Sequence, residues 1–288
     1  MSPVQLVKVS DEGSSSPFIA RIFMGLLEFR NQLFLLGTPD NERGRTQNHF
    51  DRMFQPMLDA AQATRDAALE IKGLVDAHLE EIRRGTAVRF RPGQYEILRT
   101  IDSKLSQTVD KLIDQSIVAT NTGLQSILND PLGLDIGFFF QQDAAFGAGV
   151  SGLRNAGEPD LAAYLEQVRT AWHSALQDLR TKHEHRGWSL GRIQYSLTSP
   201  SQVGASLPDV LGSPVHLFAR QTANRVLLFI ENMMVYAMQR QYNYPIFVVE
   251  IPPEHRNPVD PQRFRLAPRG LDPAPPWRIT FRDDSNFV

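Results

Sequence analysis

One short stretch of the chain concentrates the residue types that phosphodiester chemistry requires. Residues 180–187 read Arg-Thr-Lys-His-Glu-His-Arg-Gly, so two histidines, two arginines, a lysine and a glutamate lie side by side. Histidine exchanges a proton near neutral pH, and arginine holds a phosphate with two N–H donors. RNA supplies its own nucleophile, the 2′-hydroxyl. We therefore expect Arg180 to hold phosphate and His185 to be the acid/base, supported by Thr181, Lys182, His183 and Glu184.

Two other interpretations of this stretch stay open. Cations stabilise the negative end of a helix dipole, so basic residues at a helix C-terminus can serve the helix alone. His183 and His185 could also bind a metal ion, but residues two apart point in different directions on a continuous helix. We therefore expect neither a metal nor a cofactor.

Helical geometry limits how Arg180 and His185 can meet. Residues five apart project about 140° from one another on an ideal helix. The two side chains reach one phosphate if the helix unwinds near Gly187, or if a second subunit contributes the partner group. A symmetric homodimer is therefore part of the hypothesis.

The same stretch resembles the signature of the HEPN superfamily, helical proteins found among bacterial toxins and defence nucleases. That signature is an arginine and a histidine separated by a short spacer, here residues 181–184. Members commonly have Asn, Asp or His directly after the arginine, where this chain has Thr181. Arg43 and His49 fit the bare pattern too, in a polar segment expected to be a loop or a helix start. The likeness of the 180–185 stretch extends to Asp135–Phe140, Arg169, Trp172 and His185–Trp188.

The resemblance implies a helical bundle that dimerises, with paired signature helices lining one composite cleft. It implies a metal-independent endoribonuclease of toxin or defence type, which cuts RNA and leaves a cyclic phosphate. RNA, a second copy of the chain and an antitoxin or regulatory protein are the implied partners. Other members have lost catalysis, so the alternative is a non-catalytic helical interaction or nucleotide-binding module of the same fold.

Apolar residues recur at helical spacing through most of the chain before residue 244. This pattern predicts helices over about 17–36, 46–84, 92–128, 158–187 and 215–242, with a kink or a break at Pro56. The glycine-rich segment 131–153 predicts a short helix and a buried irregular connection. Segment 196–213, rich in Ser, Pro and Gly, predicts a loop.

The helical spacing of apolar residues ends after Tyr244. Residues 246–249 and 277–281 are β-like, and the proline-rich stretch between them is too broken for a helix. We therefore predict an all-α fold, a multi-helix bundle with long amphipathic helices and a short extended or β-like C-terminal segment. The expected units are a loose leader over 1–16, a helical bundle domain over 17–244 and the extended segment over 245–288.

A second polar cluster lies on the last predicted helix. Arg220, Asn224 and Glu231 fall near one face of it, with Arg225 beside them. These side chains could line a cleft, but polar residues on one face of a helix are most often solvated. We therefore expect a solvated helix face here.

Composition sets the outer limits on function. The chain of 288 residues has 42% apolar residues and a formal net charge of −2, which predicts a globular protein without a strong field. The lack of cysteine excludes disulfides, thiolate zinc sites and a cysteine nucleophile. Arginine far outnumbers lysine among the 30 basic residues, which permits RNA binding but also follows from a GC-rich genome.

No targeting or membrane signal is evident in the sequence. Residues 1–17 are polar and lack an apolar stretch of signal-peptide length. The most apolar run, 226–238, is interrupted by Glu231 and Asn232 and is too short to span a bilayer. We therefore expect a cytoplasmic protein with no membrane partner.

Overall fold

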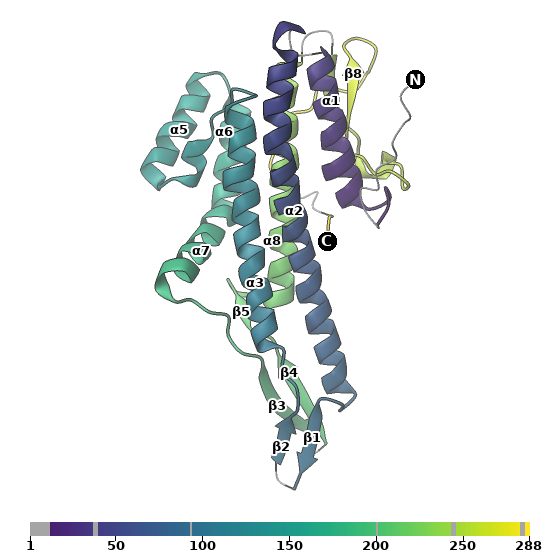
Figure 1. Cartoon of the computed structure of the whole chain (residues 1–288), viewed down its shortest axis with the longest axis vertical. Helices are drawn as coiled ribbons and strands as arrows, with labels where there is room; N and C mark the ends of the chain where they lie inside the picture. Colours follow the sequence, from purple (N-terminus) through teal and green to yellow (C-terminus); the bar gives the residue numbers. More distant parts are fainter. Residues whose placement is uncertain (1–11, 37–39, 93, 200, 243–245, 283–285) are drawn as a thin grey trace.

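The computed structural model describes residues 12–36, 40–92, 94–199, 201–242, 246–282 and 286–288. Within these ranges the protein is mostly helical, and its strands form small antiparallel pairs (Figure 1). The mainly helical fold predicted from the apolar spacing is confirmed. Most of the expected leader, residues 1–11, lies outside the described residues.

Three long helices lie side by side along the long axis of the molecule (Figure 1). They are α2 (Asp40–Arg83), α3 (Asp102–Ile117) and α8 (Val215–Gln241). α3 continues directly into a π-helical turn, η2 (Val118–Leu124), and then into α4 (Gln125–Asn129). At the N-terminal side, the π-helical η1 (Ile19–Gly25) leads into α1 (Leu26–Leu36), which packs on α8. One hydrophobic core joins these elements, with side chains such as Phe50, Leu112 and Phe229 fully buried.

Pro56 was predicted to kink or break the helix, and the break is wrong because α2 is not split there. The helix runs unbroken from Asp40 to Arg83 and begins earlier than predicted. A proline inside a helix costs about 3 kcal/mol because one hydrogen bond is lost. Here the neighbours Phe54, Met57 and Leu58 are buried in the core, while Pro56 itself is exposed to solvent. Core packing on one face therefore outweighs the defect on the other.

Two hairpins replace elements predicted differently. β1 (Val88–Arg91) pairs with β2 (Gln94–Ile97) where the start of a helix was expected, and α3 begins only at Asp102. β3 (Gln194–Ser199) pairs with β4 (Gln202–Ser206), and this hairpin takes up the first part of the segment 196–213 that was expected to be a loop.

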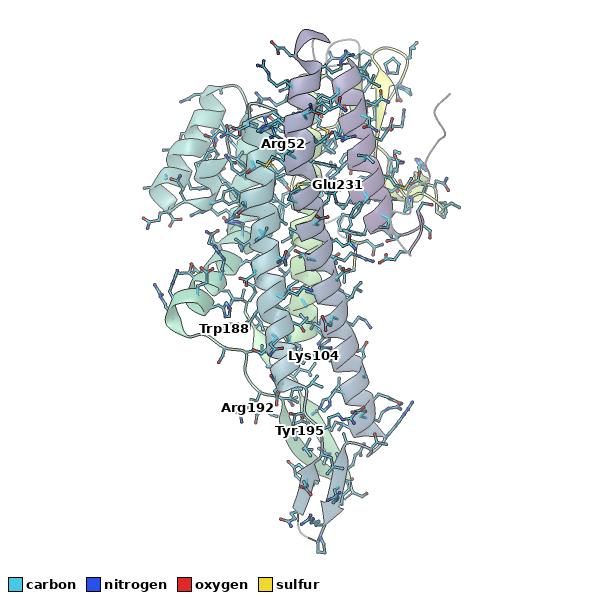
Figure 2. All side chains as sticks on the ribbon, in the orientation of Figure 1. Arg52, Lys104, Trp188, Arg192, Tyr195 and Glu231 are labelled. Carbon is cyan, nitrogen blue, oxygen red and sulfur yellow. The ribbon has the colours of Figure 1, made fainter. Side chains whose placement is uncertain are left out.

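The hairpins lie together at the end of α2 (Figure 1). Ile82 at the end of that helix forms a small core cluster with Val88 and Val203. The Tyr95 hydroxyl donates to the carbonyl of Tyr195, which is labelled in Figure 2, at 2.9 Å. The Tyr195 hydroxyl lies 2.8 Å from His78 Nε2. Long-range contacts therefore stabilise these short strands.

A peripheral group of helices carries the signature stretch. The 3₁₀ turn η3 (Gly137–Phe140) and α5 (Asp143–Asn155) precede α6 (Pro159–Val168). α6 runs directly into the π-helical η4 (Arg169–His173) and then into α7 (Ser174–Arg186). The helix predicted over 158–187 is thus confirmed in its bounds, with a π turn in its middle. The segment 131–153, expected to be irregular with a short helix, holds both η3 and α5.

Gly149 of α5 faces the ring of Phe138 at very close range. A Cβ added at Gly149 would lie 2.0 Å from Phe138 Cγ, whereas one added at Gly147 on the same helix meets nothing within 4 Å. We expect Gly149→Ala to lower the free energy of unfolding by about 1–3 kcal/mol through overpacking. Gly147→Ala should be neutral or stabilising, because alanine favours the helix. Urea unfolding of both variants checks this, and equal stabilities would contradict it.

The C-terminal segment packs on the helices. β7 (Ile246–Glu250) pairs with β8 (Phe264–Pro268), with the 3₁₀ turn η5 (Pro253–His255) between them. A shorter pair, β5 (Asp209–Val210) and β6 (Ser213–Pro214), precedes α8. The β-like prediction is confirmed for 246–249 and wrong for 277–281, which is not a strand. The backbone N–H of Trp277 nevertheless donates to the Val248 carbonyl at 2.8 Å. The side chains of Trp277, Ile279 and Phe287 are buried in the main core.

Two of the polar residues of α8 are buried, so the predicted solvated face is wrong. Arg220 and Arg225 are exposed, but Glu231 is 1% and Asn224 8% exposed. Asn224 Oδ1 accepts the backbone N–H groups of Phe287 and Val288 at 2.9 and 3.1 Å. The C-terminal end of the described chain is therefore held by a side chain of α8.

Glu231, which is labelled in Figure 2, is the centre of a buried ionic cluster. Arg21 Nε donates to Glu231 Oε1 at 2.9 Å, and Arg263 Nη1 donates to Glu231 Oε2 at 2.9 Å. Both arginines are 2% exposed. Their charges compensate the buried carboxylate, which joins η1, α8 and the segment before β8.

No helix among the described residues combines the length and the apolar character needed to cross a membrane.

Candidate functional site

α7 presents the signature stretch at its exposed C-terminal end. Leu176 and Leu179 are buried and hold one face of the helix against the core. The helix ends at Gly187, whose φ of 66° is left-handed and suits glycine. The backbone N–H of Trp188 then donates to the Lys182 carbonyl at 3.1 Å. From Trp188, which is labelled in Figure 2, the chain turns away toward β3. The buried leucines and the glycine cap therefore fix the position of the exposed last turn of α7.

Arg180 and His185 both lie against the carboxylate of Glu184. Arg180 Nη2 is 2.8 Å from Glu184 Oε1, and His185 Nε2 is 3.7 Å from Glu184 Oε2. Arg180 Nε is buried and has no hydrogen-bond partner in the described part of the chain. The His185 side chain is 71% exposed. One carboxylate thus links the guanidinium and the imidazole that the sequence singled out.

Unwinding of the helix is not how the two residues approach each other. α7 stays helical through Arg186. Glu184 is four residues after Arg180 and therefore lies on the same face of the helix. His185 directly follows Glu184 in the chain. The second route, a partner group from another subunit, stays a prediction.

The other supporting residues of the stretch have different surroundings. His183 Nδ1 lies 3.5 Å from Asp110 Oδ1 on α3, and its ring contacts that of Trp188 at 6.3 Å between centroids. Burial raises the pKa of the Asp110 carboxyl, and the nearby His183 opposes this effect. Lys182 is exposed. His183 is thus placed to tie the end of α7 to α3, away from Glu184.

Thr181 connects the signature to a cavity on the other side of α7. Its hydroxyl donates to the Gln177 carbonyl at 3.0 Å, one turn earlier. The cavity has a volume of about 720 Å³ and lies between the η4–α7 helix and the segment that follows η3. Its lining is mostly polar and includes Phe140, Asp143, Arg169, His173, Gln177, Asp178 and Thr181.

His173 is the most buried polar group in the lining. It is 1% exposed, and its ring lies 4.3 Å from that of Phe139 and 5.7 Å from that of Phe140. Neither ring nitrogen has a hydrogen-bond partner among the described residues. Burial, with a contribution from the positive charge of Arg169, lowers the pKa of His173 to about 3. The ring is therefore neutral at physiological pH and offers one unused donor and one unused acceptor.

Arg169 and Gln177 complete the polar wall. Arg169 Nη1 donates to the Phe139 carbonyl at 2.9 Å, Nη2 donates to Asp143 Oδ1 at 2.8 Å, and the guanidinium lies 4.4 Å above the Phe146 ring. Gln177 Nε2 donates to the Phe140 carbonyl at 3.4 Å, but Gln177 Oε1 is buried without a partner. Arg169 thus fixes the position of η3, while Gln177 keeps an acceptor free.

The buried histidine makes stability depend on pH. Its folded pKa lies below the usual value near 6.5, so stability is fully present above that value and is lost as the pH falls toward 3. Between pH 7 and pH 5 we expect this group to remove roughly 2 kcal/mol from the free energy of unfolding. His173→Phe, which keeps a ring among the aromatic neighbours, should remove this part of the pH dependence. Chemical unfolding of both proteins at the two pH values checks it, and parallel profiles would contradict it.

The second match to the bare pattern is not a comparable site. Arg43 and His49 both lie in the first turns of α2, which confirms the helix start and not the loop. Arg43 Nη2 donates to the Leu35 carbonyl at 3.4 Å, whereas His49 Nε2 lies 3.5 Å from Asp130 Oδ2. No shared carboxylate links the two residues in these contacts.

Sequence reasoning missed His173 and Gln177. It noted Arg169 and Trp172 only as flanking residues, because nothing in the helical pattern marks the position after Trp172 as lining a cavity. A histidine beside a tryptophan in an otherwise apolar stripe was the only available signal. Among the described residues, no group of three or more His, Cys, Asp or Glu side chains is arranged to hold a metal ion.

Comparisons with protein-family models, with curated proteins and with solved structures found no match to this chain.

Proposed function

We propose that this protein is a metal-independent endoribonuclease of the HEPN type, acting as a toxin or defence enzyme. The observation that supports this most is the arrangement of Arg180 and His185 on opposite oxygens of the Glu184 carboxylate. A cation for phosphate and an acid/base group thus each lie beside one oxygen of the same carboxylate. These are the groups that transfer of a phosphate to the 2′-hydroxyl requires.

In the proposed reaction, the 2′-hydroxyl of RNA attacks the adjacent phosphorus and the bond to the 5′-oxygen breaks. His185 exchanges the proton, either taking it from the nucleophile or giving it to the leaving oxygen. Arg180 binds the non-bridging oxygens, using the Nε–H that has no partner and the Nη2 that Glu184 now holds. Glu184 orients the imidazole once the phosphate has taken its place on Arg180. The product is a 2′,3′-cyclic phosphate.

A homodimer is part of this proposal. The fold is a bundle of long amphipathic helices in this proposal. Two copies of the bundle pair so that the α7 helix of one lies beside the α7 helix of the other. Lys182 and Arg186 are exposed at the end of α7 and add positive charge around the phosphate site. A second histidine from the partner would let one imidazole act as base and the other as acid. An antitoxin or regulatory protein would act by covering this end of α7.

The test is cleavage of single-stranded RNA by the wild-type protein in excess chelator. We expect fragments with cyclic phosphate ends, and a dimer in analytical ultracentrifugation. Intact RNA at protein concentrations where the dimer forms would overturn the proposal.

One observation favours the second candidate, a non-catalytic nucleotide-binding or interaction module. The cavity beside α7 contains unused hydrogen-bonding groups, whereas the Arg180 guanidinium is already paired with Glu184. This candidate predicts ligand binding without cleavage, so the same assay separates the two.

A further inference from the structure

We propose that the cavity between η3 and α7 binds a nucleobase, either as a free nucleoside or as a base in an RNA strand. The RNA source rests on the proposed function, whereas binding of the base itself does not. The site is built from Phe140, Arg169, His173 and Gln177, with Thr181 at its border with the signature stretch.

The first reason is a set of unused hydrogen-bonding atoms. Both nitrogens of His173 and Oε1 of Gln177 are buried and unpaired in the described structure. Leaving such groups unpaired is unfavourable, so native proteins satisfy nearly all of them with protein, water or ligand atoms. A neutral imidazole and an amide carbonyl together offer one donor and two acceptors. A nucleobase edge, which alternates N–H donors with O and N acceptors, is complementary to this set.

The second reason is shape and apolar surface. Small-molecule sites usually enclose about 300–1,000 Å³, a range that includes this cavity of about 720 Å³. Phe140 is partly buried and lines it. Proteins commonly bind unpaired bases by stacking them on such rings. A planar heterocycle therefore suits the site better than a flexible chain does.

The third reason is charge. Arg169, the cation of the lining, is already bound to the Asp143 carboxylate and to the Phe139 carbonyl. Asp178 adds a further carboxylate to the wall. An anion such as phosphate would meet more negative than positive charge here, so the ligand is a neutral group.

The fourth reason is position. Thr181 lines the cavity and follows Arg180 directly in the chain, so the base site and the phosphate site lie on one turn of α7. His173 also ends the π turn η4, a type of irregularity that is frequent at functional sites. A base held in the cavity would place the adjoining backbone of the strand near Arg180.

Calorimetric titration of the full chain tests the assignment. The probes are the four ribonucleosides, a short single-stranded RNA, ribose and inorganic phosphate. The variants are His173→Phe and Gln177→Leu, each of which removes unpaired polar atoms while keeping side-chain bulk. Gln167→Leu, an exposed position on α6 outside the lining, is the matched control. A circular dichroism spectrum confirms that each variant is folded.

We expect at least one nucleoside to bind, with an affinity about tenfold or more weaker in both cavity variants and unchanged in the control. Binding of RNA alone, weakened in the same two variants, would place the base in a strand. His185→Ala should bind nucleosides as the wild type does, so a failure of cleavage is distinguishable from a failure of this site. Binding of phosphate alone, or equal affinities in all proteins, would overturn the assignment.

Discussion

His185→Ala is expected to slow RNA cleavage by about 10²–10⁴-fold, the usual contribution of a positioned acid/base group. The imidazole is 71% exposed and contacts the protein through Glu184, so its removal should leave the fold unchanged. Initial rates in excess chelator, with RNA well above and well below saturation, measure the effect. Because the histidine acts on the proton in the transition state, the loss should fall on kcat, with a smaller change in KM.

Arg186→Ala is the matched control for this variant. Arg186 belongs to the same last turn of α7, is exposed and carries a positive charge, but it has no part in the Glu184 contacts. Its removal should weaken RNA binding modestly and in a salt-dependent way, through the loss of one cation near the backbone. Equal rates for His185→Ala and the wild type, or equal losses in both variants, would refute the acid/base role.

Glu231→Gln is expected to lower the free energy of unfolding by about 3–5 kcal/mol, the cost of removing one member of a buried ion pair. The amide keeps the size of the side chain but leaves Arg21 and Arg263 without their shared counter-charge. Arg263 retains Glu250, whose Oε1 accepts from its Nε at 2.8 Å, whereas Arg21 keeps the Phe287 ring 4.2 Å from its guanidinium. Chemical unfolding monitored by circular dichroism measures the loss.

Glu166→Gln provides the comparison for that experiment. Glu166 pairs with Arg154 at the surface, where both side chains are more than 40% exposed. A solvated pair contributes only about 0–1 kcal/mol, so the same chemical change should have little effect there. A loss at Glu231 no larger than the loss at Glu166 would show that the buried cluster is not a main source of stability.

The buried cluster also gives stability a second dependence on pH. Burial raises the pKa of the Glu231 carboxyl, but Arg21 and Arg263 together have a larger, opposite effect. The pKa of Glu231 therefore lies below its usual value. A depressed carboxyl pKa contributes stability that is present above the unfolded value and is lost as the pH falls through the folded one. Glu231→Gln should therefore be less sensitive to acid than the wild type.

The sequence predicted the helices better than the strands because the two signals differ in length. The apolar repeat of α8 extends over 215–241, and its bounds were predicted almost to the residue. β1 and β2 span four residues each, too few for an alternating pattern to stand out beside a helical one. Their stability comes from Tyr195 and Val203, about a hundred residues away, and no local pattern contains that contact.

The same reason explains what was predicted of the candidate site. Arg180, Glu184 and His185 are neighbours on one helix, so their proximity follows from sequence spacing alone. The cavity depends on η3, whose Phe139 and Phe140 lie more than thirty residues before His173 and Gln177. Glu231 was assigned to a solvated face for a related reason, since its partners stand at positions 21 and 263.

The π turn η4 sets the rotational phase between α6 and α7. If Arg169–His173 wound as an ordinary α-helix instead, the same residues of α7 would be rotated by about 100° relative to α6. Gln177 and Thr181 would then no longer face η3, and Arg180 would leave its present side of the helix as well. The wider turn therefore fixes which residues of α7 face η3, and α7 keeps its present orientation only while this turn stays π-helical.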